Sequence, residues 1–186
     1  SKPYRLIKED LWTSRCESFE AWTGDFCNRV KAQECGEPQI ILGYSMGGRL
    51  ALHAILHEPT LWKKAIIVAA DPGPLDLRSK QMALKNDENW AKRFITEDWD
   101  SLINEWDNQK IFGGRLPDLM RLEMDFSRPA IARLFKVFSK GNQHNLRSKF
   151  SCIKSPEILY ISGIEDQKYI EIGKEFASIC PAVRLE

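Results

Sequence analysis

Short apolar runs alternate along this chain with segments whose apolar residues recur at helical spacing. Runs typical of buried strands lie at 39–42, 66–70 and within 155–169, a further strand is expected in 4–12, and another begins at 182–186. Helices are expected directly after the 39–42 run and after the run within 155–169. An earlier helix is expected from the spacing of Phe19, Trp22, Phe26 and Val30. The alternation predicts an α/β class protein with a mostly parallel sheet.

The middle of the chain breaks this alternation. Residues 76–150 are rich in charge and tryptophan, show helical spacing and contain no convincing strand pattern. We therefore expect a helical cap inserted between core strands. The predicted organisation is a first part of the core at 1–75, the cap at 76–150, and a second part of the core at 151–186.

The segment GYSMGG separates the 39–42 run from the helix that follows it. Gly43 and Gly47 flank Ser45 with the spacing G-x-S-x-G, and a larger side chain at either glycine is expected to collide with the neighbouring strand or helix. The spacing predicts a nucleophile elbow that lifts the Ser45 hydroxyl above the sheet, with the Met46 amide as one donor of an oxyanion hole. A closely packed or phosphate-binding glycine turn is the alternative, but the pattern G-x-x-x-x-G-K-[ST] is absent.

Composition and charge are those of an ordinary globular enzyme domain. The 186 residues are 43% hydrophobic, and 27 basic residues against 26 acidic ones give a net charge of +1. Without a long basic run, neither nucleic acid nor an anionic membrane is expected as a partner. We expect a small-molecule carboxylate or ester as substrate.

The cysteines are odd in number and form no C-x-x-C pair, so the sequence indicates neither a disulfide framework nor a metal site. They are Cys16, Cys27, Cys35, Cys152 and Cys180. No cofactor motif appears. With no signal peptide and no long apolar run, a cytoplasmic location is expected.

The order of these features is that of an α/β-hydrolase with a cap. The quoted segments GYSMGGRLAL, DPGPL, NWAKRFIT with LINEWDNQKIF, and SGIEDQKY cover most of the chain. Together they resemble the 2-succinyl-6-hydroxy-2,4-cyclohexadiene-1-carboxylate synthases of the menaquinone pathway, which are lyases of the α/β-hydrolase fold. In that family the serine is thought to act within a triad as the base that removes a substrate proton, after which pyruvate is expelled.

The resemblance implies roles for the elbow residues and for an acid. Ser45 would be the triad serine, Asp166 the acid that orients a catalytic histidine, and Met46 an oxyanion-hole donor through its backbone. Asp166 stands just after a predicted strand, as the acid of this fold does, although an aspartate there could simply cap the helix near Tyr169.

Three further positions are implied to bind substrate. Arg49, one helical turn beyond Ser45, would present its guanidinium to a substrate carboxylate, and Trp106 would line the pocket. Tyr44 stands beside the nucleophile. The alternatives are an Arg49 that pairs with an acid on a solvated surface, and a Trp106 that belongs to the core of the cap.

Two departures from the family pattern keep other functions open. Where the family places further carboxylate-binding arginines, this chain has Ala83 and Glu123, and Arg78, Lys80, Arg121 or Arg128 would have to substitute. If none does, an ester or thioester hydrolase is favoured over the lyase.

The second departure is that no histidine follows Asp166, although the fold's order is Ser, Asp, His. His53 and His57 are expected to pack on their helix, and His144 to lie on the surface. We expect the chain to be cut at both ends, with the catalytic histidine and the second oxyanion donor outside it. The alternative is a non-catalytic binding protein.

Overall fold

A computed structural model describes residues 5–33, 37–109 and 120–186. Four parallel strands form one sheet in the order β1-β2-β3-β4. They are β1 (Gln39–Tyr44), β2 (Trp62–Val68), β3 (Glu157–Ile161) and β4 (Val183–Leu185). The apolar runs of the sequence thus correspond to strands, and the pattern at 182–186 does begin a fourth one.

The strand expected within 4–12 is wrong for its described part. Residues 5–10 have no regular structure, and a turn follows at 11–13. Leu6 is 79% exposed, so this segment lacks the buried face that an apolar alternation needs to stabilise a strand. The chain that follows is held against α5 (Arg128–Val137) instead, where the Arg133 guanidinium donates to the backbone oxygens of Leu11 and Cys16.

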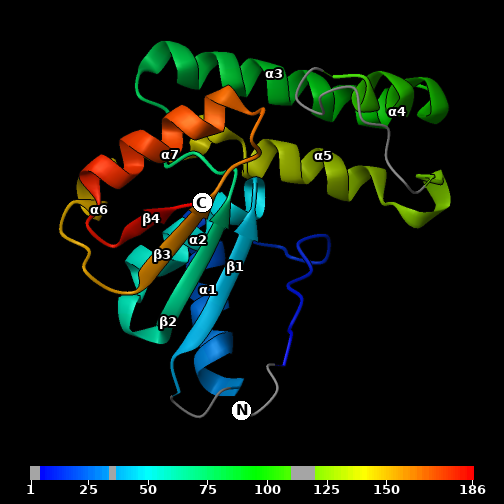
Figure 1. The fold of residues 1–186 in the computed structure, drawn as a ribbon. Coiled ribbons are helices and arrows are strands. Elements are labelled where there is room, and N and C mark those ends of the chain that lie inside the picture. The colour runs from blue at the N-terminus through cyan, green and yellow to red at the C-terminus, as the bar shows by residue number, and fades with distance from the viewer. Residues whose placement is uncertain (1–4, 34–36, 110–119) are drawn as a thin grey trace.

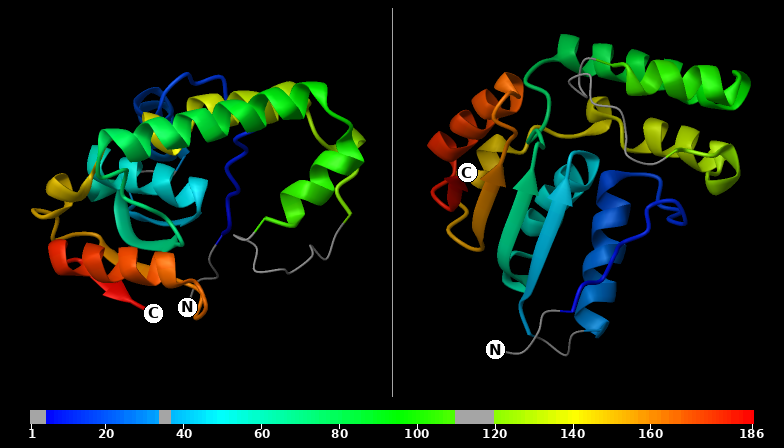
Figure 2. Two further views of the ribbon diagram at one scale, coloured as in Figure 1. Left: turned by 90° about the horizontal axis from the view of Figure 1, so that it is seen from above. Right: turned by 45° about the vertical axis from the view of Figure 1, so that its right-hand side comes forward.

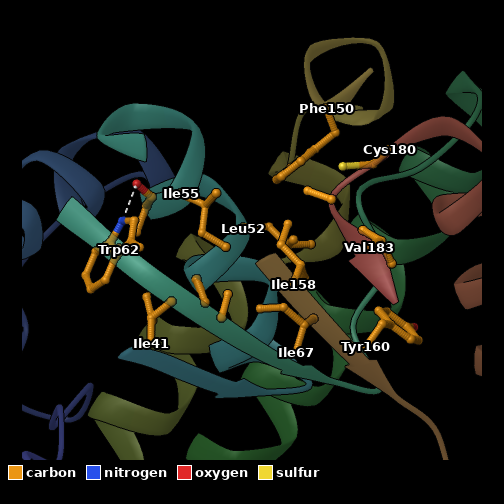
Figure 3. Packing of buried hydrophobic residues seen from close by; sticks show 14 of the residues in the cluster. Ile41, Leu52, Ile55, Trp62, Ile67, Phe150, Ile158, Tyr160, Cys180 and Val183 are labelled. Atoms are coloured by element: carbon orange, nitrogen blue, oxygen red, sulfur yellow. Dashed lines mark hydrogen bonds between the residues drawn. The ribbon is translucent and has the colours of Figure 1, made fainter. Parts of the chain in front are cut away.

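Helices cover one face of the sheet and its carboxyl end. The helices α1 (Phe19–Gln33) and α2 (Met46–His57) lie behind the sheet in Figure 1, and α7 (Gln167–Ile179) packs beside β4. Figure 3 shows Leu52 and Ile55 of α2 over Ile67 and Ile158 of the strands. Because side chains alternate along a strand, the intervening positions face the other side, where Leu42 is 64% exposed.

The regular secondary structure described between β2 and β3 is all helical. It contains α3 (Leu77–Thr96), α4 (Trp99–Asp107), η3 (Glu123–Asp125), α5 (Arg128–Val137), η4 (Lys140–Asn142) and α6 (Arg147–Phe150), and a short η1 (Pro59–Leu61) precedes β2. Helices α3 and α5 run side by side above the carboxyl ends of the strands (Figures 1 and 2). Their aromatic residues form a cluster separate from the sheet core.

The return from this helical segment to the sheet is fixed by a buried ion cluster. Arg147 donates to Glu175 at 3.0 Å and to Asp71 at 3.4 Å, and Lys140 also pairs with Asp71. Arg147 is 7% exposed, so its charge is compensated inside the protein. The cluster ties the loop after β2 to α7, and it thereby fixes where the chain enters and leaves the helices above the sheet.

Candidate active site

Ser45 occupies a strained turn between β1 and α2. Its backbone has φ 50° and ψ −112°, a region that costs free energy for a residue with a side chain. The Ser45 amide donates to the Val68 oxygen at 2.9 Å, and the Ser45 carbonyl accepts from the Arg49 amide at 3.0 Å. Its hydroxyl makes no capping hydrogen bond to α2 and is therefore available to a ligand.

The glycines around Ser45 are not equivalent. A Cβ on Gly43 would lie 2.6 Å from the Gly47 carbonyl carbon and 2.7 Å from the Gly48 Cα, whereas a Cβ on Gly47 would meet nothing within 4 Å. The expectation of a collision is thus correct for Gly43 and wrong for Gly47. Gly48 is the second crowded position, because a Cβ there would meet the Ala70 side chain at 2.5 Å.

A cavity of about 400 Å³ opens between the elbow and the helices above it. Ser45, Met46 and Arg49 form its floor, and its walls are mainly apolar rings. The wall residues are Trp12, Asp87, Phe94, Trp99, Ile103, Trp106, Arg121, Phe126, Ile131, Leu134, Phe135 and Phe138. A concave apolar site with a few polar groups is the usual form of a small-molecule pocket.

Arg49 is the cationic group of the cavity floor. Its guanidinium lies over the Phe19 ring, 5.6 Å from the centroid, and its buried Nη1 atom has no hydrogen-bond partner in the described part of the chain. Burial lowers the pKa of Arg49, and the negative charge of Asp87 opposes that effect. A guanidinium stays protonated in proteins, so half-buried Arg49 brings a positive charge with one buried, unused donor to the cavity.

The other arginines considered as substitutes are bonded within the protein. Arg121 lines the cavity but pairs with Asp107, while Arg128 donates to Glu123 at 2.6 Å and to backbone oxygens. Neither Arg78 nor Lys80 is among the described residues that line the cavity. Arg49 is thus the one lining arginine, within the described ranges, that has a buried donor without a partner.

The two aromatic candidates differ in position. Trp106 lines the cavity and meets the Trp90 and Phe135 rings edge-on, with centroids 4.9 and 5.5 Å apart. Trp106 therefore belongs both to the cavity wall and to the aromatic cluster of α3, α4 and α5. Tyr44 is 64% exposed and is not one of the described residues that line the cavity.

Known structures share the fold of this chain. MenH from S. aureus superposes with a TM-score of 0.81 at 22% sequence identity, over 94% of this chain and 68% of that one. A thermophilic esterase from Thermogutta terrifontis gives a TM-score of 0.64 at 15% identity, over 90% and 62% of the two chains. This chain has the α/β-hydrolase fold.

Sequence relatives of this α/β-hydrolase-fold chain are enzymes. The 2-succinyl-6-hydroxy-2,4-cyclohexadiene-1-carboxylate synthase of Escherichia coli O1:K1 is 26% identical over 175 residues, which are 92% of this chain and 69% of that protein. The enzyme of the same name from Serratia proteamaculans is 26% identical over 140 residues, 73% and 54% of the two proteins. No protein-family model matches the chain.

In this hydrolase-fold chain Asp166 lies in the loop between β3 and α7, at the same end of the sheet as Ser45. Its carboxylate accepts from the Tyr169 amide at 3.3 Å and so caps α7. Asp166 does not line the described cavity, and β2 separates its strand from that of Ser45. The capping contact is present, and the catalytic role remains a prediction.

None of the three histidines lines the cavity. His53 is 8% exposed and stacks on Phe19 with centroids 4.7 Å apart, and burial lowers its pKa to about 4. His144 lies near Glu20, with its Nε2 atom 3.5 Å from the carboxylate, and His57 is exposed. The packing expected for His53 and the surface position expected for His144 are confirmed, whereas the packing expected for His57 is wrong, because that side chain is exposed.

Among the described residues, no group of three or more histidine, cysteine, aspartate or glutamate side chains is arranged to hold a metal ion. None of the described helices combines the length and apolar character needed to cross a bilayer.

Sequence reasoning missed Trp12 and Asp87 as lining residues. Trp12 lies in the segment held by Arg133, far from the elbow in sequence, and it meets the Phe126 ring at 6.2 Å. Asp87 stands in a run of charged residues on α3 whose spacing is that of a solvated helix face. No signal in the sequence distinguishes it from the neighbouring Glu88.

Proposed function

We propose that this chain supplies the serine and the carboxylate pocket of an α/β-hydrolase-fold enzyme that acts on a small-molecule carboxylate. The observation that carries the proposal is the joint position of Ser45 and Arg49. Ser45 stands at a strained elbow, and its hydroxyl makes no cap hydrogen bond. It lines the same aromatic cavity as the half-buried Arg49 guanidinium, whose buried Nη1 donor has no partner among the described residues. A nucleophile or base beside a fixed anion-binding group is suited to chemistry on a carboxylate-bearing substrate.

The proposed reaction is the release of pyruvate, as in the synthases that share sequence with this chain. Ser45, deprotonated by a base, would remove a proton from the substrate, and the electron pair left on the substrate carbon would expel pyruvate. The Met46 amide, in the first turn of α2, would donate to the oxygen on which negative charge develops. Asp166 would act through its charge on the base that serves Ser45.

Ester or thioester hydrolysis is the second candidate, and one observation favours it. The cavity wall is mostly aromatic, and Arg121 is neutralised by Asp107. A second substrate carboxylate would therefore find no free guanidinium among the described lining residues. In hydrolysis the Ser45 oxygen would attack the acyl carbon, the alcohol or thiol would leave, and water would then release the acid.

One set of assays separates these reactions. Pyruvate release from the synthase substrate and hydrolysis of short acyl esters are measured with and without added imidazole, because no histidine of this chain lines the cavity. Ser45→Ala should lower the rate of whichever reaction the protein catalyses by about a hundredfold or more. Ser178→Ala, on an exposed part of α7, should leave that rate unchanged. Rapid ester cleavage without pyruvate release would select the hydrolase. Ligand binding without any turnover that depends on Ser45 would instead indicate a binding protein.

Asp166 is tested against a matched helix cap. Asp98 caps α4 by accepting from the Ser101 amide at 3.0 Å, as Asp166 caps α7. Asparagine caps a helix about as well as aspartate, so Asp166→Asn and Asp98→Asn both keep the cap and remove only a charge. A catalytic Asp166 predicts a large loss of turnover in the first variant alone. Equal activity in the two variants would mean that Asp166 only caps α7 and has no catalytic role.

A further inference from the structure

Trp12 brings an aromatic ring to the cavity from outside the cap helices. It lies in the segment that turns beneath α5 before α1 begins (Figure 1), whereas the other aromatic residues of the described wall lie between positions 94 and 138. In that wall the rings of Trp99 and Trp106 each pack on Phe94, with centroids 6.1 and 5.8 Å apart. Trp12 meets the wall at Phe126 instead, with the two rings edge to face and their centroids 6.2 Å apart.

The backbone around Trp12 is fixed although its side chain is not buried. The Trp12 amide donates to the Asp10 carboxylate at 2.9 Å, and the Arg133 guanidinium donates to the Leu11 carbonyl oxygen at 3.3 Å. The Leu11 side chain also packs against the buried cluster around Phe19. The turn therefore keeps the Trp12 ring at the cavity, even though the residue is 48% exposed.

This exposure separates Trp12 from the rest of the wall. Phe94 and Trp99 are only 4% and 3% exposed, so a ligand in the cavity has little of their surface left to cover. Trp12 still offers nearly half of its surface, because its own segment supplies no side chain that covers it. Removing apolar surface from water favours association, so a ligand that reaches Trp12 gains affinity there.

We propose that Trp12 is a specificity-determining residue, whose indole ring covers a six-membered ring of the substrate while Arg49 binds a carboxylate on that ring. The inference rests on the proposed function for the position of the substrate. A six-membered ring that bears a carboxylate is also the chemistry in the name of the related synthases, a cyclohexadiene-1-carboxylate. A compact ring packs on an aromatic side chain with little loss of conformational freedom, whereas an open chain must first be ordered.

Calorimetric titration of the full chain with three small probes tests the proposal without any need for turnover. Cyclohexanecarboxylate and heptanoate have the same charge and the same number of carbon atoms, but only the first has a ring. Cyclohexanecarboxamide keeps the ring and lacks the charge. We expect the unchanged chain to bind cyclohexanecarboxylate about tenfold more tightly than heptanoate.

Trp12→Ala should lower the affinity for cyclohexanecarboxylate by about tenfold and that for heptanoate by less than about threefold. Trp12→Phe retains an aromatic ring and should keep most of the preference for the cyclic acid. Trp12→Leu, which keeps an apolar side chain without a ring, should lose the preference and gives a second measurement if the alanine variant melts at a lower temperature. Leu6→Ala is the matched control, because Leu6 is exposed in the same segment and does not line the cavity, and both affinities should stay unchanged.

Three outcomes would overturn the inference. The first is an unchanged chain that shows no preference for cyclohexanecarboxylate or does not bind it. The second is a Trp12→Ala protein that binds this acid as tightly as the Leu6→Ala control does. The third is a Trp12→Ala protein that loses the same factor of affinity for both acids, which would make Trp12 an unselective apolar cover. Failure of the proposed function looks different, because the amide would then bind as tightly as the acid while the loss caused by Trp12→Ala persisted.

Discussion

Gly43→Ala should disrupt the elbow, whereas Gly47→Ala should not, although both glycines belong to the same G-x-S-x-G pattern. A Cβ at position 43 would lie 2.6 Å from the Gly47 carbonyl carbon and 2.7 Å from the Gly48 Cα. Carbon atoms in contact are normally about 3.5–4.0 Å apart, so the start of α2 would have to move away from β1 by about 1 Å. Both contacts are with backbone, and no side-chain rotation can relieve them.

The expected cost follows from this crowding. Overpacking in a protein core costs about 1–3 kcal/mol, and we expect a value near 3 kcal/mol because the obstructing atoms are backbone. For a chain of this size that corresponds to a fall of about 6–12 °C in Tm. At Gly47 a Cβ meets nothing within 4 Å, and alanine in a helix is favoured over glycine by up to about 1 kcal/mol. Gly47→Ala should therefore be neutral or slightly stabilising.

Urea unfolding followed by circular dichroism measures both variants against the unchanged chain, and the shift in midpoint gives the difference in unfolding free energy. Two results would refute the reasoning. A Gly43→Ala protein within about 0.5 kcal/mol of the unchanged chain would mean that the elbow can relax. A Gly47→Ala protein as unstable as Gly43→Ala would mean that the pattern, rather than the local geometry, sets the requirement.

Two further predictions concern buried charges. Arg147→Met removes a partner of Glu175 and buried Asp71, so it should lower the unfolding free energy by about 3 kcal/mol, while Arg184→Met, in an exposed pair, should cost less than about 1 kcal/mol in the same urea experiment. Burial lowers the pKa of His53 from 6.5 to about 4, so between these pH values the unfolded chain binds a proton at this histidine and the folded chain does not. The free energy of unfolding should therefore fall by about 3 kcal/mol as the pH drops from 6.5 to about 4. In the His53→Gln protein the free energy of unfolding should depend less on pH over this range. If it depends on pH as strongly as in the exposed His57→Gln control, His53 is not the group responsible.

Local signals in the sequence predicted most of the sheet and the elbow. The apolar runs around Leu42 and Ile66 became β1 and β2, in which buried positions alternate with more exposed ones because successive side chains of a strand point to opposite faces. Ser45 and Arg49 could be placed together for the same local reason, since they stand one helical turn apart at the start of α2. Signals of this kind act within a few residues and do not depend on the rest of the fold.

Long-range contacts explain what could not be predicted. Leu6 and Ile7 suggest a strand, but a strand forms only where a neighbour pairs with it, and here both side chains are exposed. Trp12 reaches the cavity because Arg133 holds the preceding backbone against α5. Asp87 faces the elbow because α3 packs on α5 above the sheet. In each case the tertiary arrangement selects one side of a segment whose sequence leaves the choice open.

Arg49 explains part of the affinity expected for a carboxylate, because one of its buried donors has no partner among the described residues. Asp87 lowers the cost of burying Arg49, yet both its oxygens are bonded on the α3 side, and the Arg49 Nη1 atom keeps an unused hydrogen. A buried donor without a partner costs about 1–3 kcal/mol, which a ligand carboxylate would return on binding. The unliganded protein thus holds part of its binding free energy at Arg49.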